Sequence, residues 1–460
     1  MVPERLRPLL DETASLAERF TAAGHRLYLV GGSVRDAILG RSIDTRDLDF
    51  TTDARPDQIE GVLAGWADAI WDQGRRFGTI GARKDGRAYE ITTHRAEAYS
   101  PDSRKPEVAF ADAVEADLSR RDFTVNAMAL ALPDAELIDP FGGVSDLAST
   151  RLRTPLGPQE SFTDDPLRML RAARFLAGYG LVPDPDLVDA VKSLRGRMEI
   201  VSVERIRDEL DKLLVVETPG QGLWFLVHTK LAEEFLPELP ALALEMDPVH
   251  HHKDVLAHTI AVVDKTRPDK VLRLAALLHD IGKPKTRSFG PGGVTFHHHE
   301  VVGARMAEER MRALHYPTEE IAQVRRLVEL HLRFHGFGTG WTDSAVRRYA
   351  RDAGPLLDKL NELTRCDCTT RNQAKARELA RRMDQLEARI AELEAQEELH
   401  RIRPELDGHQ IMEHLGIGPG PLVGRAYAHL LEIRLDEGPL GEEEARRRLD
   451  AWWAENRPTD

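Results

Sequence analysis

The sequence is poor in cysteine and in long apolar runs, and each shortage excludes a class of protein. Only two of its 460 residues are cysteines, Cys366 and Cys368, which provide neither a disulfide framework nor the paired ligands of a zinc ribbon. No stretch approaches the roughly 20 consecutive apolar residues of a membrane-spanning helix. Residues 1–20 form a charged, amphipathic pattern rather than a signal peptide. These features predict a cytoplasmic protein that does not act at a membrane.

The chain also lacks an excess of positive charge. It has 77 acidic and 63 basic side chains, which give a formal net charge of -14. Nucleic-acid binding draws on clustered Lys and Arg, so this balance argues against such a partner unless the basic residues gather locally.

Hydrophobic periodicity changes along the chain. Short apolar or alternating runs at residues 27–30, 48–51 and 88–92 predict strands of a small mixed sheet flanked by helices. From Asp164 onward, stretches rich in Leu, Ala, Arg and Glu predict one helix after another. The predicted fold class is therefore α+β, with a small mixed-sheet head followed by an elongated all-α region.

One long helix is expected over residues 372–400, where apolar residues recur at alternating spacings of four and three. This seam is shorter than the three to four heptads of a coiled coil, so it predicts packing within the chain. The seam consists of Leu379, Met383, Leu386, Ile390 and Leu393.

The head contains a predicted metal and phosphate site, although no GxxxxGK[ST] loop is present. Gly31 and Gly32 stand where a strand is expected to turn into a helix, so backbone N–H groups there can approach a phosphate closely. Asp47 and Asp49 are two residues apart on a predicted strand and share a face. Each pattern alone is common by chance. In this order they predict Mg²⁺, which favours one or two carboxylates plus phosphate oxygens.

At these residues the chain resembles the class II CCA-adding enzymes and poly(A) polymerases of the polymerase-β nucleotidyltransferase superfamily. GGSVRD at 31–36 and DLD at 47–49 match the GGxVRD turn and the DxD of that family. RRDFTVN at 120–126 is similar to its RRDFTxNA segment, and DDPLRMLRAAR at 164–174 to its template helix. The resemblance covers residues 27–214. The nucleotide-binding residues that it implies are Gly31, Gly32, Arg35, Arg121, Asp122, Asp165, Arg168, Arg171 and Arg174.

The resemblance implies catalysis by two Mg²⁺ ions that Asp47 and Asp49 bridge. Such ions, about 4 Å apart, activate an RNA 3'-hydroxyl and stabilise the leaving pyrophosphate. Relatives often carry a further carboxylate on a following strand, and Glu90 occupies the corresponding kind of place. A strand Glu is also an ordinary edge residue.

The template segment predicts which bases are selected. If Asp165 and Arg168 lie one turn apart on a helix edge, a carboxylate acceptor and a guanidinium donor can face one base. Cytosine and adenine both offer an amino donor beside a ring-nitrogen acceptor and match this pair, whereas uracil and guanine do not. Arg174 falls nearly opposite Asp165, so Arg171 and Arg174 are assigned to phosphates or to helix packing. Without the head motifs, the three arginines would be read as a solvated face.

A second group of His and Asp residues resembles the ligand set of an HD-type phosphohydrolase domain. The matching residues are His258, the pair His279 and Asp280 in HDIGKP, and Asp367. His299 and His331 could complete a second metal position. The resemblance implies a divalent transition metal held by imidazoles and carboxylates. The competing interpretation is a helical scaffold that has lost its metals.

The expected organisation is a nucleotidyltransferase head (1–147), a neck that binds RNA and the nucleotide base (148–245), an HD domain (246–370) and a helical tail that binds tRNA (371–460). The expected function is template-independent, Mg²⁺-dependent addition of C, C and A to the 3' end of tRNA from CTP and ATP. The alternatives are a poly(A) polymerase on RNA 3' ends and an HD-type phosphohydrolase acting on nucleotides or cyclic phosphates.

Overall fold

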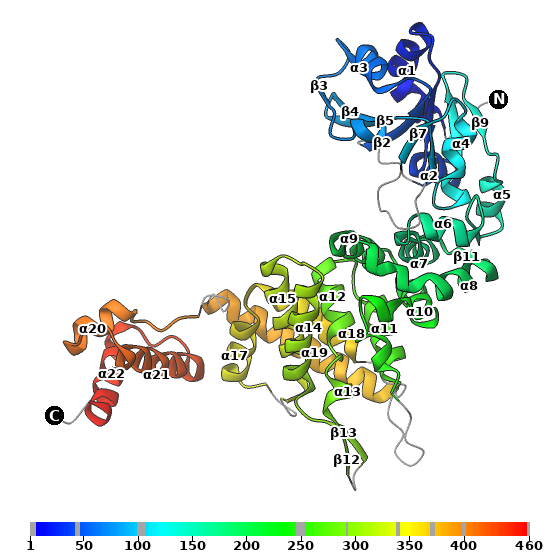
Figure 1. Cartoon of the computed structure of the whole chain (residues 1–460). Helices are drawn as coiled ribbons and strands as arrows, with labels where there is room; N and C mark the ends of the chain where they lie inside the picture. The colour runs from blue at the N-terminus through cyan, green and yellow to red at the C-terminus, as the bar shows by residue number, and fades with distance from the viewer. Residues whose placement is uncertain are drawn as a thin grey trace. The chain divides into compact units, whose positions relative to one another are not determined.

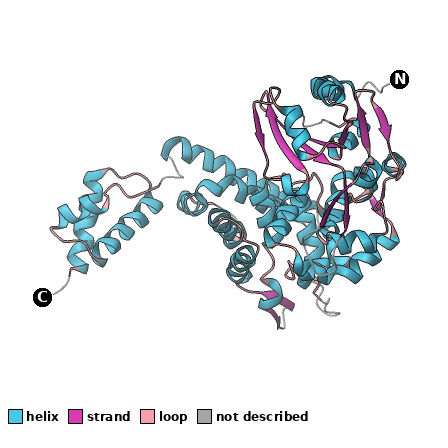
Figure 2. Cartoon of the chain, turned by 45° about the horizontal axis from the view of Figure 1, so that its top comes forward, coloured by secondary structure: helices cyan, strands magenta, loops and turns pink. Residues whose placement is uncertain are grey.

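The computed structural model describes residues 6–41, 47–98, 107–244, 254–290, 293–336, 341–368, 373–397 and 402–457. The chain forms two compact units, Met1–Pro240 and Ala241–Asp460. A mixed sheet lies in the first unit and helices dominate the rest (Figures 1 and 2). The predicted fold class, a mixed-sheet head followed by a helical region, is confirmed. None of the helices described here is long and apolar enough to span a membrane.

The first unit is built on a seven-stranded sheet in the order β3-β4-β5-β2-β1-β8-β9. Strands β2 and β5 run parallel, and every other neighbouring pair in this sheet is antiparallel. The predicted strands at 27–30, 48–51 and 88–92 are all present. The bounds are β1 (Leu27–Val30), β2 (Asp47–Thr52), β3 (Ala69–Trp71), β4 (Thr79–Lys84), β5 (Arg87–Thr93), β8 (Ala129–Leu132) and β9 (Glu136–Ile138).

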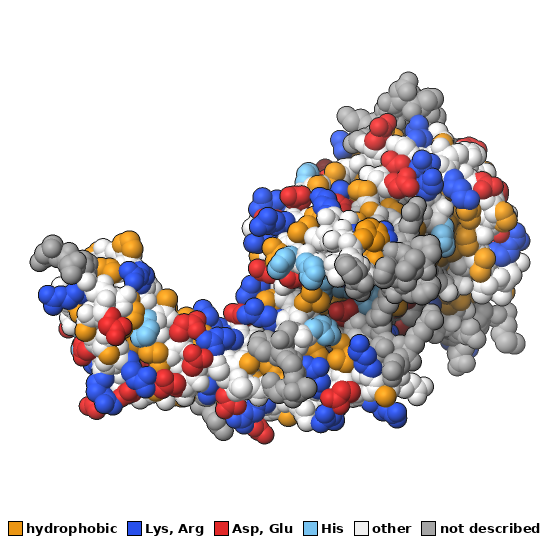
Figure 3. All heavy atoms as spheres, turned by 90° about the horizontal axis from the view of Figure 1, so that it is seen from below, with side chains coloured by type: hydrophobic (Ala, Val, Ile, Leu, Met, Phe, Trp, Pro, Cys, Tyr) orange, Lys and Arg blue, Asp and Glu red, His pale blue; other side chains and the backbone are white. Residues whose placement is uncertain are grey.

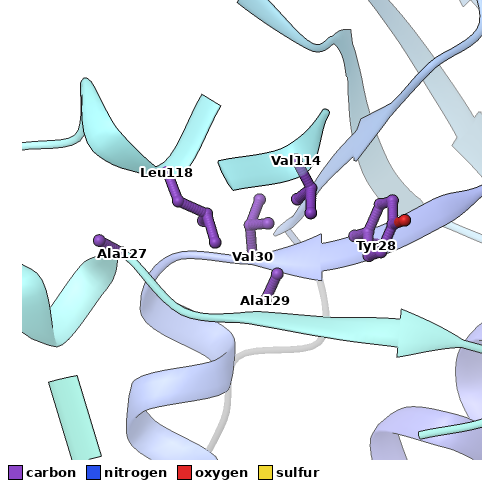
Figure 4. Packing of buried hydrophobic residues seen from close by; sticks show 6 residues of the cluster. All are labelled: Tyr28, Val30, Val114, Leu118, Ala127 and Ala129. Atoms are coloured by element: carbon purple, nitrogen blue, oxygen red, sulfur yellow. The ribbon is translucent and has the colours of Figure 1, made fainter. Parts of the chain in front are cut away.

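Helix α4 (Val114–Ser119) packs on the sheet through a small apolar cluster. Val114 and Leu118 point at Val30 of β1 and Ala129 of β8 (Figure 4). This packing fixes the end of α4, from which the chain continues into the RRDFTVN segment. The other helices of the head are α1 (Arg7–Ala22), α2 (Gly32–Leu39), α3 (Pro56–Leu63) and α5 (Gly143–Ala148).

The polar segment 95–110 begins and ends in strands. Strands β6 (Arg95–Ala98) and β7 (Glu107–Phe110) pair antiparallel, and residues 99–106 lie outside the described part of the chain.

The neck consists of helices packed around α7 (Leu167–Tyr179), which contacts α9 and α10. The short strands β10 (Arg151–Leu152) and β11 (Val182–Pro183) pair beside it. The remaining neck helices are α6 (Pro158–Asp164), α8 (Pro185–Leu194), α9 (Val203–Leu214) and α10 (Gly220–His228).

The second unit is helical apart from the hairpin of β12 (Arg287–Gly290) and β13 (Gly293–Phe296). Helix α19 (Gln373–Glu397), which we placed in the tail, packs against α17 and α18. Met383, Leu386, Ile390 and Leu393 of the predicted seam are buried there. The other helices are α11 (Val255–Lys265), α12 (Lys270–Leu278), α13 (Lys283–Thr286), α14 (His299–Ala313), α15 (Thr318–Leu330), α16 (Arg333–Gly336), α17 (Asp343–Ala353) and α18 (Leu357–Asp367).

The last three helices, α20 (Gly408–Leu415), α21 (Pro421–Glu437) and α22 (Glu442–Asn456), share a core of their own. Helix α21 contacts α17, where Arg348 pairs with Asp436 at 2.7 Å. Basic and acidic side chains are intermixed over these helices (Figure 3), and Arg448 pairs with Glu437 at 3.0 Å. In these ion pairs an acidic side chain neutralises the charge of a neighbouring arginine.

We predict that Gly222→Ala destabilises the first unit. A Cβ at Gly222 in α10 would lie 2.5 Å from the carbonyl oxygen of Ala173 in α7, so the helices would have to separate. Overpacking of this kind costs about 1–3 kcal/mol. Gly196→Ala is the matched control, because its Cβ would meet no atom within 4 Å. Urea unfolding measures both changes, and equal stabilities would contradict the expectation.

Candidate active site and candidate metal centre

Predicted catalytic carboxylates meet where β2 and β5 run side by side. Their parallel register pairs Asp49 with Glu90 and Asp47 with Ala88. Directly paired residues share a face of the sheet, so the exposed side chains of Asp49 and Glu90 project from the same face. The period of two predicts this face for Asp47 as well, although the side chain of Asp47 lies outside the described structure.

The glycine turn reaches the same place from β1. Gly31 has φ +76° and ψ −136°, a backbone conformation that residues with a side chain rarely adopt, and it precedes α2 directly. A Cβ on Gly31 would lie 3.2 Å from Nη1 of Arg121 and 3.8 Å from Oδ2 of Asp49. The turn, a carboxylate and a guanidinium are thus adjacent, which suits a phosphate group and a cation together.

Asp117 holds Arg121 in this position, and the sequence interpretation missed it. Its carboxylate is 1% exposed and accepts from Nη2 of Arg121 at 3.2 Å and from Nε of Arg120 at 3.3 Å. Burial alone would raise the pKa of Asp117, but these two guanidinium groups outweigh it and lower the pKa. The spacing of four residues between Asp117 in α4 and Arg121, just after the end of α4, was the available signal.

Arg35, a predicted nucleotide ligand, lies in the packing between head and neck. Its guanidinium is 6% exposed and donates to Asn126 Oδ1 at 2.5 Å, to both carboxylate oxygens of Asp36, and to the hydroxyl of Tyr179. It also stands over the Tyr179 ring, 4.1 Å from its centre. Arg35 therefore joins α2 to α7, and a nucleotide contact by Arg35 stays a prediction.

Asp122 and Arg171 form a buried ion pair, with 2.7 Å between Oδ2 and Nη2. Asp122 also accepts from Nδ2 of Asn126 at 2.9 Å and from the backbone N–H of Phe123 at 2.8 Å. Burial opposes ionisation of Asp122, but Arg171 dominates and lowers its pKa. Both predicted nucleotide ligands thus contact protein groups, and a nucleotide contact by either one stays a prediction.

The two other arginines of α7 are also held by protein groups. Arg168 is 8% exposed and donates to Ser161 Oγ at 2.8 Å and to the carbonyl of Arg120. Arg174 donates to Glu209 and stands over the ring of Phe175. For Arg174, helix packing was one of the two predicted roles.

Asp165 does not lie on the template helix as we expected. It has an extended backbone (φ −135°, ψ 98°) between α6 and α7, because the proline at position 166 disfavours a helical residue before it. Its carboxylate accepts from the N–H of Leu167 at 3.2 Å and from Nη2 of Arg205 at 2.9 Å. Arg205 of α9 is therefore the guanidinium in contact with this carboxylate.

The second unit brings together all four predicted ligands of the HD site. Nε2 of His258 lies 2.9 Å from Oδ1 of Asp367, and Nε2 of His279 lies 3.2 Å from Oδ2 of Asp280. His258, His279 and Asp280 form one group that could hold a metal ion. Asp280, His299 and His331 form another, so Asp280 belongs to both.

The imidazoles have the orientation of metal ligands. In His279, His299 and His331, Nδ1 bonds the carbonyl three residues earlier, at 2.6 to 2.8 Å. This fixes each ring and leaves Nε2 to face the others. These three Nε2 atoms are buried and, among the described residues, make no hydrogen bond of good geometry. A cation in each of the two groups, with Asp280 shared between them, would satisfy these nitrogens and the Asp280 carboxylate, so the residues fit divalent metal ions.

Positive groups of the protein face the carboxylates of this site, and Nζ of Lys283 lies 2.6 Å from Oδ2 of Asp280. Burial opposes protonation of His279, but Asp280 and Asp367 outweigh it and raise its pKa to about 10. Burial and the nearby His279 lower the pKa of His331 to about 4. A proton on His279 and the ammonium group of Lys283 therefore offset the two carboxylates when no metal is bound.

Known protein families match the chain in three blocks. The Poly A polymerase head domain matches residues 27–153, the probable RNA and SrmB-binding site of polymerase A matches 180–242, and the HD domain matches 249–393. An A-adding tRNA nucleotidyltransferase of Deinococcus radiodurans is 32% identical over 446 residues, which is 94% of this chain and 96% of that protein. The chain belongs to the tRNA nucleotidyltransferase family.

Other members of the tRNA nucleotidyltransferase family match in part or in fold. The CCA-adding enzyme of Bacillus subtilis is 41% identical over 213 residues, 46% of this chain and 52% of that enzyme. The chain thus spans about half the length of several CCA-adding relatives that it matches. The CCA-adding enzyme of Bacillus stearothermophilus in complex with CTP has the same fold, with a TM-score of 0.69 at 22% identity, over 98% of both chains.

We predict that metal binding to the HD site strengthens as pH rises. Because the pKa of His279 is about 10 without metal, an ion must displace its proton at neutral pH. One displaced proton makes the affinity rise about tenfold per pH unit. Calorimetric titration with Mn²⁺ at pH 6.5 and 7.5 measures the change. Asp280→Asn should abolish the binding, and equal affinities at the two pH values would contradict the assignment.

Proposed function

We propose that this protein extends the 3' end of tRNA with C, C and A, taken from CTP and ATP, with Mg²⁺ and without a nucleic-acid template. The convergence of Gly31, Asp49, Glu90 and Arg121 supports this proposal, because it combines phosphate donors with carboxylates suited to a cation. The family membership narrows the acceptor to tRNA.

In this proposal, Asp47 and Asp49 hold Mg²⁺, with Glu90 as a further ligand. Bound Mg²⁺ supplies the Lewis acid that lowers the pKa of the RNA 3'-hydroxyl and offsets charge on the leaving pyrophosphate. The N–H groups at Gly31 and Gly32 bind the triphosphate, and Arg121 beside them offsets its charge. Asp117 keeps Arg121 aimed at the turn.

In this proposal, Asp165 and a neighbouring guanidinium select the base of the incoming nucleotide. The carboxylate of Asp165 accepts from the exocyclic amino group that cytosine and adenine share, and a guanidinium donates to the adjacent ring nitrogen. Arg168 was our expected donor, and its terminal nitrogens bond Ser161 and Arg120 in this structure. Arg205, half exposed and 2.9 Å from Asp165, is a second candidate donor.

A second candidate function is addition of the terminal A alone. The observation in its favour is the relative from Deinococcus radiodurans, which covers nearly the whole chain and is described as A-adding. Both functions use the same head, and they differ in whether CTP is accepted.

Transfer assays with defined acceptors distinguish the candidates. We expect tRNA lacking its CCA end to gain C and then A, and Asp49→Asn to lower the rate at least a hundredfold by weakening the Mg²⁺ site. Addition of A alone, and only to tRNA that ends in CC, would instead support the second candidate. Long A tracts would indicate a poly(A) polymerase.

The matched control is His279→Ala in the HD site, which should leave nucleotide addition intact. We propose a secondary phosphohydrolase activity at that site, and the same variant should lose release of phosphate from nucleotides or cyclic phosphates. Loss of nucleotide addition in His279→Ala would contradict the independence of the two sites.

We predict that Asp165→Ala relaxes base choice. Removal of the acceptor carboxylate should raise incorporation of U and G relative to C and A more than it slows addition of C. The expected change in selectivity is about tenfold or more, because a lost polar contact costs about 1–3 kcal/mol. Competition between CTP and UTP on one acceptor measures it. Unchanged selectivity would remove Asp165 from the recognition of the base.

A further inference from the structure

A cavity of about 350 Å³ lies beside the candidate active site, on the side away from the glycine turn. It is lined by side chains of β3, β4 and β5, by the turn that follows β3, and by Arg95 at the start of β6. The lining residues that matter here are Trp71, Phe77, Gly81, Glu90 and Arg95. Its volume is at the lower end of ordinary ligand pockets and offers room for one nucleotide.

Strand register places this cavity on the same face as the carboxylates. Trp71 pairs with Gly81, Gly81 with Glu90, and Glu90 with Asp49, across four neighbouring strands. Residues paired in this way share one face of a sheet. Along this line, Trp71 and Asp49 stand at opposite ends, and Gly31 approaches Asp49 from β1 at the far side.

The glycine at position 81 makes room for the indole of Trp71. Its φ is not positive, so the backbone does not require glycine there. A Cβ at Gly81 would instead lie 2.0 Å from Nε1 and 2.1 Å from Cε2 of Trp71. The indole therefore lies against the backbone of β4, next to Glu90, as an aromatic surface at the edge of the carboxylates.

The turn that carries Phe77 is held firmly. It forms a short 3₁₀ helix, Arg75–Phe77, in which the N–H groups of Phe77 and Thr79 bond the carbonyl of Gly74 at 2.8 and 3.1 Å. Arg75 pairs with Asp57 and Glu60 of α3. A cavity with fixed aromatic walls needs little ordering before it binds a flat ring.

Arg95, the basic residue that lines the cavity, is connected to the glycine turn through Asp117. The backbone N–H of Arg95 points to Oδ1 of Asp117 at 3.4 Å, and Asp117 also holds Arg121 beside the glycine turn. One buried carboxylate thus contacts residues on both sides of the candidate Mg²⁺ position. Guanidinium groups and aromatic faces are the elements with which proteins bind single-stranded RNA ends.

We propose that this cavity binds the 3'-terminal nucleotide of the RNA acceptor, with its base against Trp71 and Phe77 and its phosphate near Arg95. Transfer requires two substrates on opposite sides of the carboxylates. The glycine turn and Arg121 provide for the triphosphate on one side, which leaves this cavity for the nucleotide whose 3'-hydroxyl attacks. The inference rests on the proposed function and names the acceptor subsite of that reaction.

The test separates the acceptor from the incoming nucleotide. In Trp71→Ala we expect the KM for tRNA lacking CCA to rise about tenfold, as for a lost base stack, with the KM for CTP unchanged. Trp71→Phe should restore most of the effect, and Gly81→Ala should reproduce it by displacing the indole. Phe289→Ala, an aromatic residue of β12 that is 62% exposed, is the control and should change neither constant.

Other outcomes overturn the inference. A raised KM for CTP with an unchanged KM for tRNA would assign the cavity to the incoming nucleotide, and two unchanged constants would exclude it from binding. Cross-linking with 4-thiouridine as the 3'-terminal nucleotide of the tRNA gives a direct reading. The adduct is expected within residues 71–79, and an adduct elsewhere refutes the placement. If the wild-type protein adds no nucleotide to tRNA, the proposed function fails and the inference with it.

Discussion

The architecture of the head depends on the absence of a side chain at Gly31. A methyl group there would enter the space between Arg121 and Asp49, so the glycine allows a backbone turn, a guanidinium and a carboxylate to meet. Each neighbour is fixed by a different part of the fold. The sheet register sets Asp49, and the packing of Val114 and Leu118 sets the helix from which Arg121 follows (Figure 4). Three segments that are separate in the sequence thus bring a backbone turn, a carboxylate and a guanidinium into contact, which is the combination that a phosphate and a cation need.

Sequence patterns predicted those parts of the site whose geometry is local. The glycine turn, the spacing of Asp47 and Asp49, and the His279-Asp280 pair depend on residues close together in the chain. The placement of Arg35 and Arg168 depends on partners far away, such as Tyr179 for Arg35, 144 residues later. Periodicity alone does not show that such an arginine is buried. The position of Asp165 could have been anticipated, because proline follows it.

The buried carboxylates of the two candidate sites have different charged partners. In the head, Asp117 and Asp122 are buried with arginines as partners, so their charges are already balanced by the protein. In the second unit, Asp280 contacts Lys283 and lies among histidines whose protonation can change, so part of its charge balance depends on titratable groups. The first arrangement fixes the arginines in position, with Arg121 beside the glycine turn. The second turns several imidazole nitrogens toward positions that small cations fit.

Arg35 has a consequence for how the enzyme handles two bases of different size. It connects α2, which begins at the phosphate turn, to Tyr179 at the end of α7, the helix that follows Asp165. In the proposed function, α2 begins at the phosphates of the nucleotide and α7 follows the residue that meets its base, so one buried guanidinium connects the helices at the two ends. This contact of Arg35 with Tyr179 fixes the distance between the start of α2 and the end of α7. In the proposed function, this constraint implies that a purine and a pyrimidine are accommodated by local shifts around the base, while the distance from the glycine turn to the Asp165 carboxylate stays the same.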